Sequence, residues 1–375
     1  MNKLVPLESL RGLLALWVVV GHVVSLTFSD QQLSKVHLGL LNQPILAVDL
    51  FIILSGFVIF FLLDNSRLSF GAFLIRRFFR LWPLYLVVLS ASALTLMPQL
   101  TVVEALPWRN PNIVSDIAIH NENLTRFWEN LIPHLILLQG IVPLRLLPFS
   151  DYTFVAQAWS ISLEWQFYLI APLIYWLLRT KRWKMLCVLA AAFTLLRYLN
   201  YNGEAFIGNQ FGLFAVGITS YYIFKHGRTL TGFLSNQIDF MIFASVACLY
   251  FFLPTPWPLI VWALVLSSIT LGQRSTLNKA VNWVLNLRFL KWLGQISYSI
   301  YLNHMLILYA VFAAILRFDP MISQSQFIPI ALSGTIVGTI VLSAVTYYFV
   351  EVPGIHFGKQ KKTGPLAEVS LKATP

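Results

Sequence analysis

Long apolar runs separated by short polar segments dominate the chain. A helix needs about 20 predominantly apolar residues to cross the hydrocarbon core of a bilayer, and it tolerates an occasional glycine or polar residue where neighbouring helices satisfy the backbone. This pattern predicts an all-α polytopic bundle of about ten transmembrane helices. They are expected at residues 8–28, 45–63, 78–97, 157–178, 185–200, 208–224, 237–253, 257–272, 293–316 and 327–350.

The connections between these runs are short, with one exception. A predicted loop at about residues 98–156 carries several prolines and an apolar stretch at 130–144 that is too short to span a bilayer. Such a stretch is typical of a re-entrant or interfacial segment. We expect one membrane domain over residues 1–355, which includes this loop, followed by a short basic tail over residues 356–375.

The composition supports a membrane protein. Charged residues make up 11% of the chain, whereas soluble domains carry about 25%. The net charge of +11 does not indicate nucleic-acid binding, because the basic residues sit in short clusters between apolar runs. Twenty of the 26 lysines and arginines fall on the side of the N-terminus. Such an excess marks the cytoplasmic side, so we expect both termini in the cytoplasm and a multi-pass protein of the plasma membrane, the inner membrane of a bacterium.

The first apolar run, LESLRGLLALWVVVGHVVSLTF, contains three ionisable residues. Glu8 lies one turn before Arg11, and Arg11 and His22 lie about 20° apart around a helix and about 16 Å apart along it. Ionisable groups are costly inside a membrane and usually have a use. We therefore predict a functional stripe that faces protein or a water-filled cavity. The alternative is an interfacial ion pair between Glu8 and Arg11, with His22 as a packed polar residue.

Charged residues also occur in the next two spans. Asp49 is expected near the outer end of the second span, within reach of His22, where an acid can orient an imidazole; the alternative is a helix-end acid that faces water. Arg76, Arg77 and Arg80 enter the third span from the cytoplasm, and Arg76 and Arg80 share a face. Paired guanidiniums suit a polyanion such as the phosphates of a nucleotide-like acyl carrier, although contact with lipid headgroups is an alternative.

Two later spans carry polar stripes. Ser160, Glu164 and Tyr168 lie on one helix face, and the carboxylate needs a partner or a proton there, for which Arg11 is a candidate. Tyr301 and His304 share a face of another span. A second buried histidine could be catalytic, although a hydrogen-bonded structural role is the simpler interpretation. In the second span, Ser55-Gly56 predicts close helix packing.

Six motifs in order resemble those of the acyltransferase-three family of integral membrane O-acyltransferases, from Leu7 to Pro353. They are an Arg-x10-His signature in LESLRGLLALWVVVGH, then VDLFIILSGF, RRFFRLWPLY, WSISLEWQFY and SYSIYLNH, and a closing EVP. The chain departs from the family at Glu8, where Asp is usual, and at Ala47, where Gly is frequent. Some relatives carry a further extracytoplasmic esterase-like domain, for which we expect no counterpart here.

The resemblance implies transfer of an acyl group, usually acetyl from cytoplasmic acetyl-CoA, to a hydroxyl of a surface glycan or its lipid-linked precursor. It implies His22 as general base or transient acyl carrier, and Arg11, oriented by Glu8, as a ligand of donor phosphate or of developing negative charge. Acyl-CoA would be a co-substrate, no cofactor or metal is expected to be bound, and glycan-assembly proteins are possible partners. The acyl-CoA-binding residues would be Arg76, Arg77 and Arg80, and the substrate-positioning residues Asp49, Ser160, Glu164, Tyr168, Tyr301 and His304.

Two other classes of protein are consistent with these residues. A transporter or flippase would use His22, Arg11 and Glu164 as a substrate or proton path, although no repeat of two halves is detectable. A structural subunit of a glycan-export machine would not need His22. Cys187 and Cys248 lie in apolar runs without metal-ligand spacing, and nothing indicates a disulfide framework.

Overall fold

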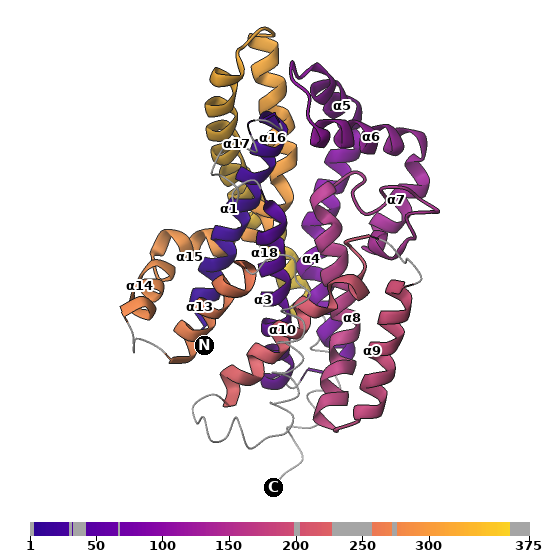
Figure 1. The fold of residues 1–375 in the computed structure, drawn as a ribbon, viewed down its shortest axis with the longest axis vertical. Helices are drawn as coiled ribbons and strands as arrows, with labels where there is room; N and C mark the ends of the chain where they lie inside the picture. Colours follow the sequence, from indigo (N-terminus) through magenta and orange to yellow (C-terminus); the bar gives the residue numbers. More distant parts are fainter. Residues whose placement is uncertain are drawn as a thin grey trace.

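The structure is a computed structural model, and it describes residues 4–29, 32, 43–66, 68–198, 203–226, 257–271 and 276–360. Within these ranges every regular element is helical (Figure 1). The predicted all-α membrane bundle is therefore confirmed. The predicted span at 237–253, Cys248 and residues 361–375 of the predicted tail lie outside the described residues.

The interior of the bundle is built around α1 (Val5–Thr27), which packs against α3, α15, α16 and α17. The bounds of these partners are Pro44–Asn65, Arg288–Gln295, Ser297–Phe318 and Gln324–Thr346. Two glycines allow the close approach of α1 and α15: a Cβ at Gly12 would lie 2.7 Å from the Gly294 nitrogen, and a Cβ at Gly294 would lie 2.1 Å from the Glu8 carbonyl oxygen. This packing fixes the position of the polar stripe on α1.

Helix α3 also packs closely against α10 (Ile207–His226). A Cβ at Gly217 would lie 2.0 Å from the carbonyl oxygen of Ile53, and one at Gly56 would lie 2.5 Å from the carbonyl oxygen of Phe214. Small residues let two backbones meet in this way. The close packing predicted from Ser55-Gly56 is thus confirmed.

One end of the bundle is covered by a helical cap. Helix α4 (Phe70–Leu94) meets α5 (Leu96–Ala105) at a bend of 63°, and α6 (Pro111–Thr125) and α7 (Phe127–Leu135) follow (Figure 1). The segment predicted as a long loop at 98–156 is therefore largely helical as far as Leu135. Its apolar stretch at 130–144 is shared between α7 and the short 3-10 turn η2 (Gln139–Ile141).

The remaining elements complete the bundle. Helix α8 (Trp159–Arg179) follows the 3-10 turn η3 (Ala156–Ala158) and is followed by α9 (Trp183–Tyr198), while α13 (Trp257–Leu271) and α14 (Thr276–Leu285) precede α15. Helix α17 continues through the π-helical turn η4 (Tyr347–Glu351) into α18 (Val352–Gln360), which packs against α4.

Five described helices are long and apolar enough to cross a membrane, or six when the bent pair α4–α5 is counted as one span. They correspond to the predicted spans that begin at residues 8, 45, 78, 157, 293 and 327. The predicted span at 293–316 differs in detail, because α15 ends at Gln295 and α16 begins at Ser297. The predicted spans at 185–200 and 257–272 form shorter helices of 16 and 15 residues. Helix α10, at the predicted span 208–224, is not among the five.

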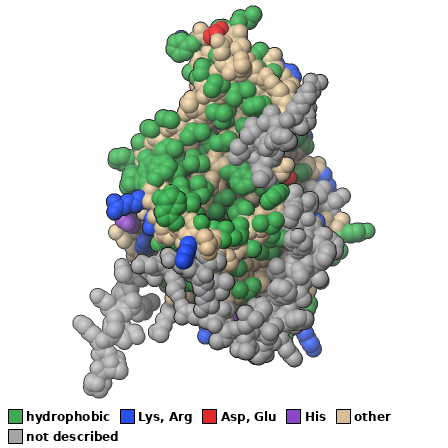
Figure 2. Space-filling view, turned by 60° about the vertical axis from the view of Figure 1, so that its left-hand side comes forward, with side chains coloured by type: hydrophobic (Ala, Val, Ile, Leu, Met, Phe, Trp, Pro, Cys, Tyr) green, Lys and Arg blue, Asp and Glu red, His purple; other side chains and the backbone are tan. Residues whose placement is uncertain are grey.

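The outer surface is apolar, as lipid contact requires. On α17, Val337, Val341 and Val345 follow one another at helical spacing and are 60%, 59% and 49% exposed. Figure 2 shows a broad hydrophobic face, with lysine, arginine and histidine side chains gathered mainly toward its lower border. This arrangement matches a belt in the hydrocarbon region bounded by charged residues at the headgroups.

A buried histidine ties the cap to the bundle. His134 on α7 is fully buried; its Nδ1 accepts from the Tyr85 hydroxyl of α4 at 2.7 Å. Its Nε2 donates to Thr153 Oγ1 at 2.9 Å and to the Ser150 carbonyl oxygen at 3.1 Å. Because a carbonyl only accepts, this network requires the neutral imidazole with its proton on Nε2. Burial accordingly lowers the pKa of His134 to about 3.

The glycine packing generates a stability prediction. Gly217→Ala inserts a methyl group into the backbone of α3 and should lower the free energy of unfolding by about 1–3 kcal/mol or more. Gly71→Ala is the matched control, since nothing lies within 4 Å of its Cβ, and it should be neutral or stabilise by up to about 1 kcal/mol. Thermal unfolding in detergent measures both. Equal midpoints for the two variants would contradict the close packing of α3 and α10.

The state of His134 generates a pH prediction. Below pH 6.5, the ordinary pKa of histidine, the unfolded chain binds a proton that the folded protein takes up only near pH 3. Stability should therefore fall as the pH is lowered from 6 to 4. His134→Gln removes this titration and should make the fall shallower, while His356→Gln on exposed α18 should leave it unchanged. Parallel curves for all three proteins would contradict a neutral His134.

Candidate functional site

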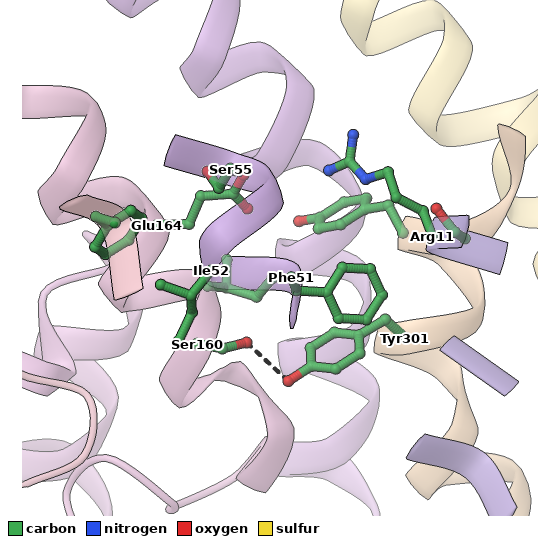
Figure 3. Close-up of a pocket in the computed structure, with 11 residues that line it drawn as sticks. Arg11, Phe51, Ile52, Ser55, Ser160, Glu164 and Tyr301 are labelled. Atoms are coloured by element: carbon green, nitrogen blue, oxygen red, sulfur yellow. Dashed lines mark hydrogen bonds between the residues drawn. The ribbon is translucent and has the colours of Figure 1, made fainter. Parts of the chain in front are cut away.

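A cavity of about 50 Å³ whose lining combines apolar and polar side chains lies inside the bundle (Figure 3). Helices α1, α3, α8 and α16 supply its polar side chains, and Figure 3 shows Arg11 on one side with Glu164 and Ser55 on the other. Several predicted site residues thus meet in one place. The lining includes Arg11, Phe51, Ser55, Ser160, Glu164, Tyr298 and Tyr301.

The polar stripe predicted on residues 160–168 forms one wall of this cavity. Glu164 accepts hydrogen bonds at the same carboxylate oxygen from Tyr168, one turn along α8, and from Ser55 Oγ of α3 at 3.3 Å. Ser160 lies one turn before Glu164 and also lines the cavity. The two neutral donors hold the Glu164 carboxylate at the wall without neutralising it.

Tyr301 joins α16 to the start of α8. Its hydroxyl donates to the Gln157 carbonyl oxygen at 2.8 Å, and its oxygen lies 2.7 Å from Ser160 Oγ (Figure 3). Gln157 in turn donates from Nε2 to the Leu302 carbonyl oxygen at 2.6 Å. These bonds fix the edge of the cavity that faces the helical cap.

Helix α4 brings two further arginines, Arg77 and Arg80, to this site. Arg77 lies over the ring of Tyr168, with 5.9 Å from its guanidinium carbon to the ring centroid. Arg80 and Arg11 lie in the fields of Glu164 and Glu351. The sequence favoured Arg76 with Arg80 as the shared face; the structure instead groups Arg77 with Arg80, which are also neighbours at a spacing of three residues. Arg76, Arg77 and Arg80 are all half-buried.

These arginines are not paired directly with acids. Within the described ranges, no carboxylate oxygen lies within 4.0 Å of a nitrogen of Arg11, Arg77 or Arg80. The Nε atoms of Arg11, Arg76 and Arg77 are buried without a hydrogen-bond partner. Three guanidiniums face two carboxylates here, so the cluster keeps positive charge that an anion can neutralise.

Two residues that the sequence did not assign belong to this cluster. Glu351 is 1% exposed and accepts from Ser299 Oγ at 2.8 Å. Tyr298 lines the cavity and donates to the Leu81 carbonyl oxygen at 2.6 Å. The closing EVP motif indicated the acid Glu351 at the end of the last span. The residues on α4 and α16 that act on Glu351 are remote from it in sequence, so the motif did not indicate them.

A second polar group lies further along α1, at the predicted His22. The His22 ring stacks near that of His304 on α16, with 5.1 Å between centroids. His304 donates from Nδ1 to the Tyr301 carbonyl oxygen at 2.7 Å, which leaves Nε2 as a buried lone pair without a partner. The structure thus places an imidazole pair between the cavity and the cap.

The acids expected beside Arg11 and His22 are Glu8 and Asp49. Glu8 is exposed, and it does not form one of the ion pairs found among the described residues. Asp49 is half-buried and has Glu204 as its charged neighbour. The carboxylate whose field reaches His22 is that of Asp116 on α6. Asp116 lies in the segment predicted as a loop, where no periodicity marked it.

The site has no obvious place for a metal ion. In the described part of the chain, no three histidine, cysteine or acidic side chains gather as metal ligands would. The donor groups present are guanidiniums, hydroxyls, imidazoles and isolated carboxylates. This set suits organic anions and hydroxyl groups.

A cluster of arginines and acids and a pair of imidazoles lie inside a bundle of membrane-spanning helices. Residues 6–348 match the family described as an acyltransferase domain, so this chain belongs to the acyltransferase-three family. The acyltransferase MdmB of Streptomyces mycarofaciens is 30% identical over 178 residues, which are 47% of this chain and 40% of that protein. The chain thus aligns with less than half the length of this relative. No solved structure matches the chain.

The charge balance of the cluster predicts anion binding. Arg80→Gln should weaken binding of pyrophosphate at least tenfold, since a hydrogen bond to a charged group contributes about 1.5–3 kcal/mol. Glu164→Gln removes a competing negative charge and should strengthen binding several-fold. Arg288→Gln, at an exposed arginine of α15, is the control. Pyrophosphate-dependent thermal stabilisation reports all three, and unchanged affinity in Arg80→Gln would contradict the site.

Proposed function

We propose that the protein is an O-acyltransferase that moves an acyl group, in the simplest case acetyl, from cytoplasmic acyl-CoA to a hydroxyl of a carbohydrate acceptor. The acceptor class is a surface polysaccharide, a lipopolysaccharide or a lipid-linked precursor. Membership of the acyltransferase family supports acyl transfer. The lysine and arginine distribution supports a bacterial inner-membrane location with the N-terminus in the cytoplasm, and residues 1–355 act as one domain in this proposal.

The observation that carries the proposal is the set of half-buried arginines that form no ion pair within the described ranges. Coenzyme A bears several phosphates, and arginine matches phosphate by charge and by its planar fork of donors. Arg11, Arg77 and Arg80 supply this charge inside the bundle, and Arg76 lies one residue away on α4. In this proposal they hold the phosphates of the donor at the cytoplasmic side.

The separation of Arg11 and His22 supports a donor that lies along α1. Eleven residues of helix place the two side chains about 16 Å apart. A donor anchored by its phosphates at Arg11 can therefore extend its thioester arm toward His22. This geometry favours the donor-phosphate role of Arg11 over direct contact with the reacting carbonyl.

His22 is the proposed base or acyl carrier, and His304 its neighbour. As base, His22 takes the proton of the acceptor hydroxyl while the hydroxyl oxygen attacks the thioester carbonyl carbon; the C–S bond then breaks and the CoA thiolate receives a proton. As carrier, a ring nitrogen of His22 attacks the thioester carbonyl carbon, the C–S bond breaks, and the CoA thiolate leaves and receives a proton. The acceptor hydroxyl oxygen then attacks the acyl carbon, the C–N bond to His22 breaks, and the hydroxyl proton passes to an imidazole nitrogen. The unpartnered Nε2 of His304 can accept a proton from His22 in either route.

The remaining polar residues position the substrates in this proposal. Glu164 and Tyr168 hold their mutual hydrogen bond at the wall of the cavity, and Ser160 and Tyr301 close its edge. Glycan-assembly proteins that deliver the acceptor are the proposed partners. Asp49 and Glu8, which form none of the ion pairs found among the described residues, are assigned no step.

A transfer assay tests the proposal. Membrane vesicles with wild-type protein receive acetyl-labelled acetyl-CoA and a glycan fraction from the source cells. His22→Ala should lose transfer by at least about a hundredfold, as expected for removal of a general base. Arg80→Ala should raise the apparent KM for acetyl-CoA and recover at high donor concentration, because it removes binding energy rather than the base.

Controls separate the alternatives in this assay. Arg288→Ala should behave as wild type. Equal labelling with His22→Ala would remove His22 from the chemistry. If the wild-type protein transfers no label with the matched glycan present, the acyltransferase proposal fails and a transporter of an anionic substrate becomes the better explanation of the buried charges.

A further inference from the structure

A second cavity lies where the helical cap meets the bundle. Residues of α5, α6, α16 and the segment that leads into α8 enclose it. Its polar lining includes Gln99, Asp116, His120, Asn123, Gln157 and Tyr309. None of these residues was assigned a role from the sequence, and none takes part in the donor site.

Two side chains of this cavity have unused acceptor atoms. Asn123 is 1% exposed and Gln157 is 2% exposed, yet Asn123 Oδ1 and Gln157 Oε1 have no hydrogen-bond donor in the described part of the structure. A buried amide oxygen without a donor costs about 1–3 kcal/mol, and folded proteins retain few of them. Two such atoms lining one cavity indicate a ligand that donates hydrogen bonds.

A carboxylate completes the acceptor set. Asp116 is buried, and its carboxylate accepts a hydrogen bond from the Tyr309 hydroxyl. The hydroxyl oxygen lies 3.1 Å from Oδ1 and 2.9 Å from Oδ2. A carboxylate offers about four acceptor positions, so capacity remains for a further donor. His120 Nδ1 donates to the Asp116 carbonyl oxygen at 2.8 Å and lies 3.5 Å from a carboxylate oxygen.

His120 decides the charge of the cavity. Burial opposes its charged form, but the hydrogen bonds and negative charge of Asp116 outweigh burial and raise the pKa of His120. Its Nε2 faces Gln99 Oε1 at 3.4 Å. The free amide oxygens of Asn123 and Gln157 accept hydrogen bonds and cannot donate them, so the cavity favours a group that donates hydrogen bonds over an anion.

The size of the cavity limits what enters it. Its volume is about 10 Å³, which is that of a single water-sized group. A hydroxyl group fits, and it can donate to one of the free acceptors while accepting a bond from a neighbouring donor. A whole sugar ring must remain outside while one of its hydroxyl groups is inserted.

We propose that this cavity is the acceptor subsite, which binds one hydroxyl group of a polyhydroxylated acceptor through Asn123, Gln157 and Asp116. The proposal rests on the acyltransferase function above and adds the position and chemistry of the acceptor side. The hydroxyl bound here is a neighbour of the one that is acylated. Its role is to hold the sugar so that the hydroxyl to be acylated lies next to His22.

The position of the cavity agrees with this role. Asp116 acts electrostatically on His22, and Met305, which lines the cavity, directly follows His304 on α16. Gln157 lines this cavity with its side chain, while its carbonyl oxygen receives the Tyr301 hydroxyl of the donor cavity. Donor and acceptor sites therefore share a wall, and the imidazole pair lies beside it.

A kinetic comparison tests the subsite. Asn123→Leu keeps the shape of the side chain but removes the acceptor, and Asn123→Asp retains an acceptor. Asn121→Leu, at an exposed position of the same helix, is the control. The rate of acetyl transfer from labelled acetyl-CoA is measured against the concentration of a glycan fraction from the source cells, and separately against that of acetyl-CoA.

We expect Asn123→Leu to raise the apparent KM for the glycan about tenfold, the equivalent of one lost hydrogen bond of about 1.4 kcal/mol. The KM for acetyl-CoA should stay unchanged, Asn123→Asp should recover most of the glycan affinity, and Asn121→Leu should match wild type. A merely structural role of Asn123 would change both KM values or the amount of folded protein, without rescue by Asp.

Other outcomes overturn the inference. If Asn123→Leu transfers acetyl with the wild-type KM for glycan and only unfolds at lower temperature, the cavity binds water and the subsite is wrong. Gln157→Leu replaces Asn123→Leu if the latter does not fold, with the same expectations. If wild type itself transfers no label, the acyltransferase function fails instead, so the two failures are distinguishable.

Discussion

Buried charge that is only partly neutralised constrains this structure. Arg11, Arg77 and Arg80 come from α1 and α4, whereas Glu164 and Glu351 come from α8 and the π-helical turn that follows α17. Such groups are costly in a bilayer unless protein or water surrounds them. The bundle therefore has to enclose them, and the glycine contacts of α1 with α15 and of α3 with α10 bring the backbones close enough to do so. The donor cavity is what remains between these helices.

The sequence predicted the spanning elements well because their signal is local. Apolar length and helical spacing located α1, α3, α8, α16 and α17, and spacing within one helix correctly joined Glu164 to Tyr168. Prediction failed where the partner lies on another element. Glu8 was paired with Arg11 because the two are neighbours on one helix, yet the acids that act on Arg11 are Glu164 and Glu351. No local pattern contains that information.

The helices of the cap were not predicted from the sequence either. The cap's proline content and mixed composition suggested a loop, whereas α5, α6 and α7 are regular helices held to the bundle by side-chain hydrogen bonds such as that of Tyr85 with His134. A short helix with a mixed surface gives a weak periodic signal, since most of its stability comes from tertiary packing. For this reason the sequence did not identify Asp116 as the acid whose charge acts on His22, and it pointed to Asp49 instead.

The two cavities differ in chemistry in the way that acyl transfer requires. In the proposed function, the donor cavity offers cationic groups and favours an anion, whereas the cap cavity offers acceptors and favours a group that donates hydrogen bonds. The two cavities then favour different substrates. In this proposal their common wall at Gln157 and Tyr301 holds the reacting ends together beside His22 and His304. Binding energy from both remote sites is thereby available to orient the thioester and the attacking hydroxyl, and orientation is a large part of the barrier for such a reaction.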